Sequence, residues 1–197
     1  MILRAFLVLL IVATVSPVAL CQEKEWDPGE AILRARMLVD AGKLRQGLAL
    51  FLQIREKAPH FRPFEVQREI CRLYERLGDI PKALKEYETL INDYPWARER
   101  IQILMRMAAM AEVALHDLDR AWGYLEEIPE DKVPSTDMAP YLFNKGYLLE
   151  KMGKPQDALR LYERLIKEYP DTVGAFWAKE RVEELSREKP GAQENGE

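Results

Sequence analysis

The chain has 197 residues, of which 48% are hydrophobic and 31% are charged, enough apolar side chains to bury the core of one domain. Its 29 Lys and Arg residues against 33 Asp and Glu give a net charge of −4, which argues against a basic nucleic-acid binder. Two cysteines and two histidines exclude a disulfide framework and leave little for a zinc site.

The first 21 residues have the pattern of a secretory signal peptide. Arg4 gives a positive start, residues 5–15 are almost continuously apolar, and a small residue lies at each cleavage-determining position before a cut after Cys21. We therefore expect residues 1–21 to be removed and residues 22–27 to form a linker. This prediction places the protein outside the cytoplasm, in the periplasm or secreted.

Two alternatives stand beside cleavage. Residues 18–21 resemble a bacterial lipobox, which would make Cys21 a lipidated residue, although Leu20 stands where that pattern has a small residue. An uncleaved segment over residues 5–21 would instead anchor the chain, but spanning a bilayer takes about 20 apolar residues. We expect contact with a membrane only through this N-terminus.

The rest of the chain repeats a pattern. Residues 76–95 (RLGDIPKALKEYETLINDYP) align with residues 151–170 (KMGKPQDALRLYERLIKEYP), residues 40–59 carry the same features, and residues 118–129 form a weaker copy. One position of the repeat is always small, at spacings of 36, 38 and 37 residues. The residues at this position are Gly47, Ala83, Ala121 and Ala158.

Each copy predicts a helix, a turn and a second helix. A turn glycine favours the left-handed end of the first helix, the small residue lets two helices approach closely, an aromatic residue follows one helical turn later, and a proline ends the second helix. In the third copy His116 replaces the turn glycine. These positions are Gly42, Gly78 and Gly153; Phe51, Tyr87 and Tyr162; and Pro59, Pro95 and Pro170. The first helices carry small residues of their own at Ala35, Cys71, Ala109 and Gly146.

This pattern resembles the tetratricopeptide repeat (TPR) family, whose unit is a helix–turn–helix of about 34 residues. The resemblance implies an all-α, right-handed solenoid of four units plus a capping helix. The units are expected at about 28–61, 64–97, 102–134 and 139–171, the cap at 172–189 and a disordered polar tail at 190–197. The apolar side of the cap, which we expect to cover the last unit, consists of Val173, Phe176, Trp177, Val182 and Leu185.

The sequence indicates no chemistry. The motifs GxSxG, HExxH, GxxxxGK[ST] and GxGxxG are absent. His60 and His116 lie far apart in predicted turns, Cys71 is expected to be a buried, inert thiol, and the acidic residues 126–131 lack the ligand spacing of a calcium loop. We therefore predict no enzyme, no catalytic residue, no metal, no cofactor and no small-molecule substrate.

The first helices of TPR arrays line a concave groove, and the resemblance implies the same here. The predicted groove has arginines in its N-terminal half and aromatic residues in its C-terminal half: Arg36, Arg68, Arg72, Arg106, Met110, Phe143, Asn144 and Tyr147. Because arginine binds carboxylates and aromatic anchors dominate peptide interfaces, we expect a protein or peptide partner of acidic character and no nucleic acid.

Self-association is the alternative function, giving a structural subunit that forms a homodimer. In that case the apolar residues Met105, Met107, Met110 and Phe143 would pack against a second copy. The repeat features also look like those of bacterial envelope TPR proteins. Among these are the periplasmic coordinator of the Tol–Pal system and the TPR lipoprotein of the outer-membrane barrel assembly machinery.

Overall fold

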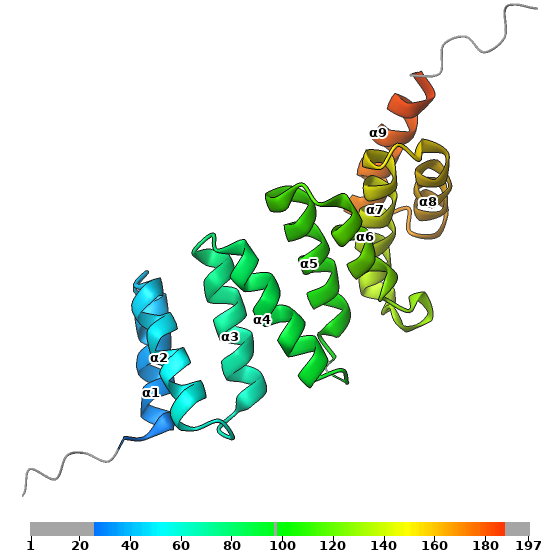
Figure 1. The fold of residues 1–197 in the computed structure, drawn as a ribbon. Coiled ribbons are helices and arrows are strands. Elements are labelled where there is room, and N and C mark those ends of the chain that lie inside the picture. Colours follow the sequence, from blue (N-terminus) through cyan, green and yellow to red (C-terminus); the bar gives the residue numbers. More distant parts are fainter. Residues whose placement is uncertain (1–25, 97, 188–197) are drawn as a thin grey trace, which may run out of the picture.

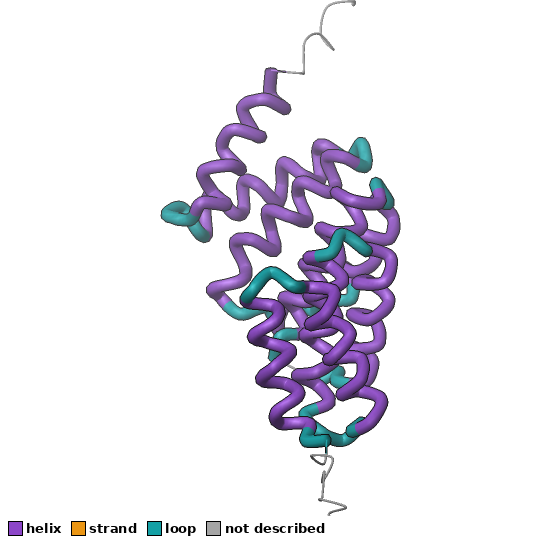
Figure 2. Tube along the Cα trace, turned by 90° about the vertical axis from the view of Figure 1, so that its left-hand side faces the viewer, coloured by secondary structure: helices purple, strands orange, loops and turns teal. Residues whose placement is uncertain are grey.

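The computed structural model describes residues 26–96 and 98–187, so the predicted signal peptide and the predicted tail lie outside the described residues. The described part contains nine α-helices and one 3₁₀ turn, and no strand (Figures 1 and 2). The helices are α1 (Pro28–Asp40), α2 (Leu44–Lys57), α3 (Pro63–Arg76), α4 (Ile80–Asp93), α5 (Arg100–Leu115), α6 (Leu118–Glu126), α7 (Ser135–Lys151), α8 (Pro155–Glu168) and α9 (Val173–Arg187), with the 3₁₀ turn η1 (Glu130–Lys132) between α6 and α7.

The helices form four consecutive pairs followed by α9. Each helix packs against the next one in the chain, and Figure 1 shows the pairs stacked side by side from α1 at one end to α9 at the other. This arrangement confirms the predicted all-α solenoid of four units with a capping helix. Within the described residues, no helix is long and apolar enough to cross a bilayer.

The turns inside the units form as predicted. Gly42, Gly78 and Gly153 have φ values of +75°, +76° and +73°, which glycine adopts without steric cost. His116 takes the same place with a φ of 54° and ends α5, so the third unit has the same kind of turn without the glycine. In each turn the next residue donates its N–H back to the first helix, for example Asp79 to the carbonyl of Tyr74 at 3.0 Å.

Small residues set how closely the two helices of a unit approach. A Cβ at Gly47 would lie 2.6 Å from Cγ2 of Val39, and one at Gly146 would lie 2.7 Å from Cε1 of Tyr162. Ala83, Ala121 and Ala158 are fully buried at the position of Gly47. The first-helix positions Ala35 and Cys71 are also fully buried, whereas Ala109, the matching residue of the third unit, is exposed.

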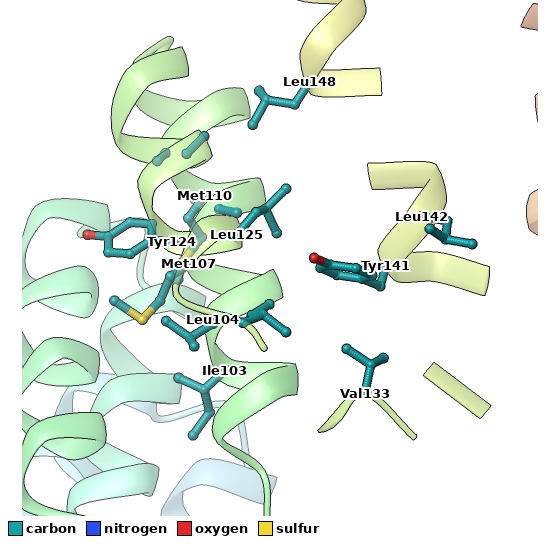
Figure 3. Packing of buried hydrophobic residues seen from close by; sticks show 14 of the residues in the cluster. Ile103, Leu104, Met107, Met110, Tyr124, Leu125, Val133, Tyr141, Leu142 and Leu148 are labelled. Carbon is teal, nitrogen blue, oxygen red and sulfur yellow. The ribbon is translucent and has the colours of Figure 1, made fainter. Parts of the chain in front are cut away.

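The core is continuous through the last three units and α9, with a smaller cluster in α1–α3. Figure 3 shows Leu104, Met107 and Leu125 in this core, with Tyr141 and Leu142 of α7 nearby. Met107 is fully buried and Met110 is only 8% exposed. Our placement of Met110 in the groove, and of both methionines in a dimer interface, is therefore wrong: their side chains point into the solenoid core.

The capping helix closes the solenoid with a different face from the one predicted. Ala175, Ala178 and Leu185 are its buried residues, because small side chains let α9 lie close to α7 and α8. The predicted apolar side is largely in solvent, since Val173, Phe176 and Trp177 are exposed. The cap begins after Thr172, whose hydroxyl accepts a hydrogen bond from the N–H of Ala175 at 3.2 Å.

Candidate functional site

The predicted groove residues all lie on the first helices of the units, on α1, α3, α5 and α7. Their arginines, however, are already engaged within the protein. Arg36 pairs with Glu65, Arg72 with Glu69 at 3.4 Å, and Arg106 with Glu75 at 3.0 Å. The list of groove arginines is thus a list of ion pairs that link or flank the first helices.

Arg68 is the arginine least able to meet a partner. Its guanidinium lies 5.6 Å from the ring centroid of Phe64 and reaches Glu99 at 3.4 Å, and its Nε is buried without a hydrogen-bond partner. Only 26% of the side chain is exposed. We therefore remove Arg68 from the predicted groove, because it packs inside the joint between units instead of facing solvent.

A joint is the place where both helices of one unit meet the first helix of the next. At the joint between the second and third units, the Tyr87 hydroxyl donates to Glu75 at 3.1 Å, and Arg106 donates to both oxygens of Glu75 at 3.0 and 3.2 Å. The carboxylate thereby connects α4, α3 and α5. Burial, followed by the nearby Glu75 charge, raises the pKa of Tyr87 far above its ordinary value, which keeps the hydroxyl protonated as a donor.

The joint between the fourth unit and the cap has the same triad 75 residues later. The Tyr162 hydroxyl donates to Glu150 at 3.2 Å, and Nε of Arg181 donates to Glu150 at 3.1 Å. Burial and the Glu150 charge raise the pKa of Tyr162, and the hydrogen bond to Glu150 raises the pKa of Arg181. Sequence reasoning missed both triads, although the offset of 75 residues between the best copies connects all three pairs of positions.

The joint between the third and fourth units replaces every member of this triad with an apolar residue. The positions of tyrosine, glutamate and arginine are occupied by Leu125, Val113 and Phe143. Ala109 lies beside them and is exposed, because Leu125 does not cover it as Tyr162 covers Gly146. The result is a pocket of about 240 Å³, lined on its apolar side by Met105, Ala109, Val113, Leu125, Phe143 and Tyr147.

The aromatic residues predicted for the C-terminal half of the groove are brought together at this pocket. The rings of Phe143 and Tyr147 are stacked, with centroids 6.3 Å apart and an interplanar angle of 7°. Asn144 lies between them on α7 and lines the pocket together with Glu112 of α5. Glu112 is paired with Lys151, whose ammonium lies 4.8 Å from the ring centroid of Tyr147.

The described residues show no arrangement for metal or nucleophilic chemistry. No group of three or more His, Cys, Asp or Glu side chains within residues 26–96 and 98–187 is placed to hold a metal ion. Cys71 is a free, buried thiol, and burial raises its pKa well above the usual range, so it is a poor nucleophile at neutral pH.

A model of the tetratricopeptide repeat family matches residues 72–95 and 141–172. A solved tetratricopeptide repeat protein from Parabacteroides merdae ATCC 43184 superposes with a TM-score of 0.68 at 16% identity, over 82% of this chain and 60% of that longer chain. The TPR-like repeats of a putative kinesin light chain from Podosopora anserina give a TM-score of 0.58 at 15% identity, over 82% and 87% of the two chains.

MamA from Desulfovibrio magneticus RS-1 is similar as well, with a TM-score of 0.56 at 12% identity over 84% of this chain and 78% of that chain. No curated protein matches the chain. At these identities the structural likeness concerns the fold. Two of the units match the family model and the whole array matches solved TPR structures, so the chain folds as a tetratricopeptide repeat solenoid, an architecture typical of protein-binding scaffolds without a catalytic site.

Proposed function

We propose that this protein is an exported, non-enzymatic TPR scaffold that holds a segment of a partner protein along its first helices, as part of a cell-envelope assembly. The pocket between α5 and α7 carries the proposal. Val113 is 66% exposed in the middle of a first helix, beside the exposed Ala109 and the stacked rings of Phe143 and Tyr147. Exposed apolar side chains gathered around one pocket are what a binding surface offers a partner.

The solenoid also supports binding by its rigidity. The polar triads at Glu75 and Glu150 fix neighbouring units relative to each other on both sides of the pocket. A preformed surface loses little conformational freedom when it binds, so a modest contact area gives useful affinity. The partner segment, extended or helical, would lose most of the entropy of association.

Photo-crosslinking in the native host tests this function directly. A photoreactive amino acid at Val113 reports on the pocket, and one at Glu163, exposed on α8, is the matched control on a second helix. We expect mass spectrometry to recover one defined partner segment from Val113 and not from Glu163. Crosslinks that are the same at both positions, or that occur only at Glu163, would contradict binding along the first helices.

Export has its own test, since it rests on the sequence of residues 1–21. The intact mass of the protein purified from its host should correspond to a chain that begins at Gln22. A mass increase on a chain beginning at Cys21 would indicate lipidation, and a full-length chain in the membrane fraction would indicate an anchor. A full-length chain in the cytosolic fraction would contradict export in every form.

Self-association remains the second candidate, but on a surface other than the buried methionines. Exposed apolar residues lie at both ends of the solenoid: Leu33 and Met37 on α1, and Val173, Phe176 and Trp177 on α9. Light scattering separates the two functions. A partner-binding scaffold is expected to be monomeric, whereas a stable dimer that covers the pocket between α5 and α7 would favour the structural subunit.

A further inference from the structure

The surface that leads from the pocket towards α3 carries ion pairs whose cations lie outermost. Side-chain exposure is 52% for Arg106 against 26% for its partner Glu75, and 49% for Arg72 against 22% for Glu69. A partner approaching this surface therefore meets guanidinium groups first, with the carboxylates partly covered beneath them. The exposed layer is positive although the chain as a whole is negative.

Both guanidinium groups retain donors for a second carboxylate. Arg106 uses Nη1 alone to reach the two oxygens of Glu75, and Arg72 uses Nη1 to reach Glu69. Among the described residues, neither arginine makes a further hydrogen bond from its other nitrogens. Because a guanidinium has five N–H groups in a planar fork, each can bind another carboxylate without losing its present partner.

The two arginines also lie close to each other and to the pocket. Arg72 precedes Glu75 by three residues on α3, so it shares a helix face with the carboxylate that Arg106 binds. Arg106 in turn precedes Ala109, which lines the pocket, by three residues on α5. One helical turn separates the positive surface from the apolar one, a length that about two or three residues of extended chain span.

We infer that the partner segment is acidic and carries one bulky apolar side chain, which enters the pocket between α5 and α7 while Asp or Glu residues two or three positions away bind Arg106 and Arg72. The inference rests on the proposed function and names the chemistry of its partner. The pocket accepts the apolar group because Glu112, one of its few polar side chains, is already neutralised by Lys151. The exposed cations then select the charge of the flanking residues.

Three fluorescein-labelled decapeptides test this chemistry by fluorescence anisotropy with the purified protein. The first is rich in Asp and Glu, with a single Phe two residues from the nearest acid. The second has Ser in place of Phe, and the third has Lys in place of every acid. We expect the first to bind and each of the others to bind at least tenfold more weakly. Equal binding of the Lys peptide, or of the Ser peptide, would overturn the inference.

Substitutions in the protein locate the binding. Ala109→Phe fills the pocket at an exposed position and should weaken the first peptide at least tenfold, whereas Ala114→Phe, exposed on the same helix but outside the pocket, should change affinity less than twofold. Arg106→Gln should weaken binding three- to tenfold, and Arg160→Gln, a paired and exposed arginine on α8, should leave it unchanged. Equal effects within either matched pair would contradict the assignment.

Failure of the inference differs from failure of the proposed function. A partner segment crosslinked through Val113 that lacks acidic residues would overturn the inference and leave the scaffold function intact. Absence of any crosslinked segment at Val113 would count against the scaffold function itself. Capture of a segment with an apolar residue beside two or more acids would support both.

Discussion

The joint between the second and third units and the joint between the third and fourth units use the same three positions with opposite chemistry. In the first, Tyr87, Glu75 and Arg106 form a hydrogen-bonded triad that connects three helices. In the second, Leu125 and Phe143 stand at two of these positions without any polar group, and a pocket of about 240 Å³ lies between the helices. One position set therefore serves either to fix neighbouring units or to leave room for a ligand.

The small residue of the first helix shows the same contrast. Gly146 is covered by the ring of Tyr162, so closely that a methyl group has no room, whereas Ala109 borders open space at the pocket. Repeat proteins distribute stability over unit interfaces. A joint that departs from the pattern of its neighbours is therefore where function is expected, because local consistency is broken there without an evident gain in packing.

The largest expected effect comes from exchanging these small residues for leucine. Gly146→Leu would force a side chain into the ring of the fully buried Tyr162 and should lower the free energy of unfolding by about 2–3 kcal/mol. Ala109→Leu, at the equivalent position, should change it by less than about 0.5 kcal/mol because its side chain meets the pocket. Urea denaturation of both variants measures the difference, and equal losses would mean that the two joints are packed alike.

Building the polar triad into the apolar joint tests whether the pocket depends on the missing triad. The triple variant Val113→Glu, Leu125→Tyr and Phe143→Arg copies the residues of the neighbouring joint. It should fill the pocket and weaken the acidic Phe peptide at least tenfold, which corresponds to about 1.4 kcal/mol of binding free energy. Retained binding by a variant that is folded according to circular dichroism would show that the pocket is not the anchor site.

Removing a triad acid should cost less, because the pair is partly in solvent. Glu150→Gln weakens the bonds from Tyr162 and Arg181 and should lower the free energy of unfolding by about 1 kcal/mol. Glu183→Gln is the matched control: its pair with Arg187 is exposed within one helix and should contribute less than about 0.5 kcal/mol. A loss at Glu183 as large as that at Glu150 would deny the triad its role in fixing the cap.

Much of the fold could be predicted from the sequence because the repeat encodes it at fixed positions. The turn glycines, the buried aromatic residues and the prolines after the second helices follow from backbone conformation and close packing, which act within one unit. His116 shows that even the departure in the third unit keeps the turn geometry. These features need no knowledge of the neighbouring units.

The binding residues could be predicted only in part because they depend on contacts between units. A helix-face pattern places Arg68 on a first helix, but it does not reveal that Phe64 and Glu99 enclose its side chain. On α5, apolar residues surround the helix, so periodicity alone could not separate the buried Met110 from the exposed Val113. The signal that was available is the 75-residue offset, which marks Val113 as the residue that breaks the triad.

The smallest expected effect concerns how the third unit is held from behind while its forward joint stays open. The hydroxyl of Tyr124, on α6, donates to Glu88 of α4 at 2.6 Å and accepts from Nε of Arg120 at 2.8 Å. Burial and the hydrogen bond to Glu88 raise the pKa of Tyr124 to about 12. The pKa of Glu88 itself is lowered, because the hydrogen bonds from Tyr124 and Arg120 together outweigh the opposing effect of burial.

This raised pKa predicts a loss of stability in alkaline solution. Between about pH 10 and pH 12 the unfolded chain has released the Tyr124 proton and the folded chain has kept it, so the free energy of unfolding falls as pH rises. Urea denaturation at pH 8 and pH 11 should show this fall in the wild type and a smaller one in Tyr124→Phe. Val113→Ala, which touches only the apolar joint, should keep the wild-type difference between the two pH values. An undiminished fall in Tyr124→Phe would mean that this contact contributes nothing to holding the third unit on the second.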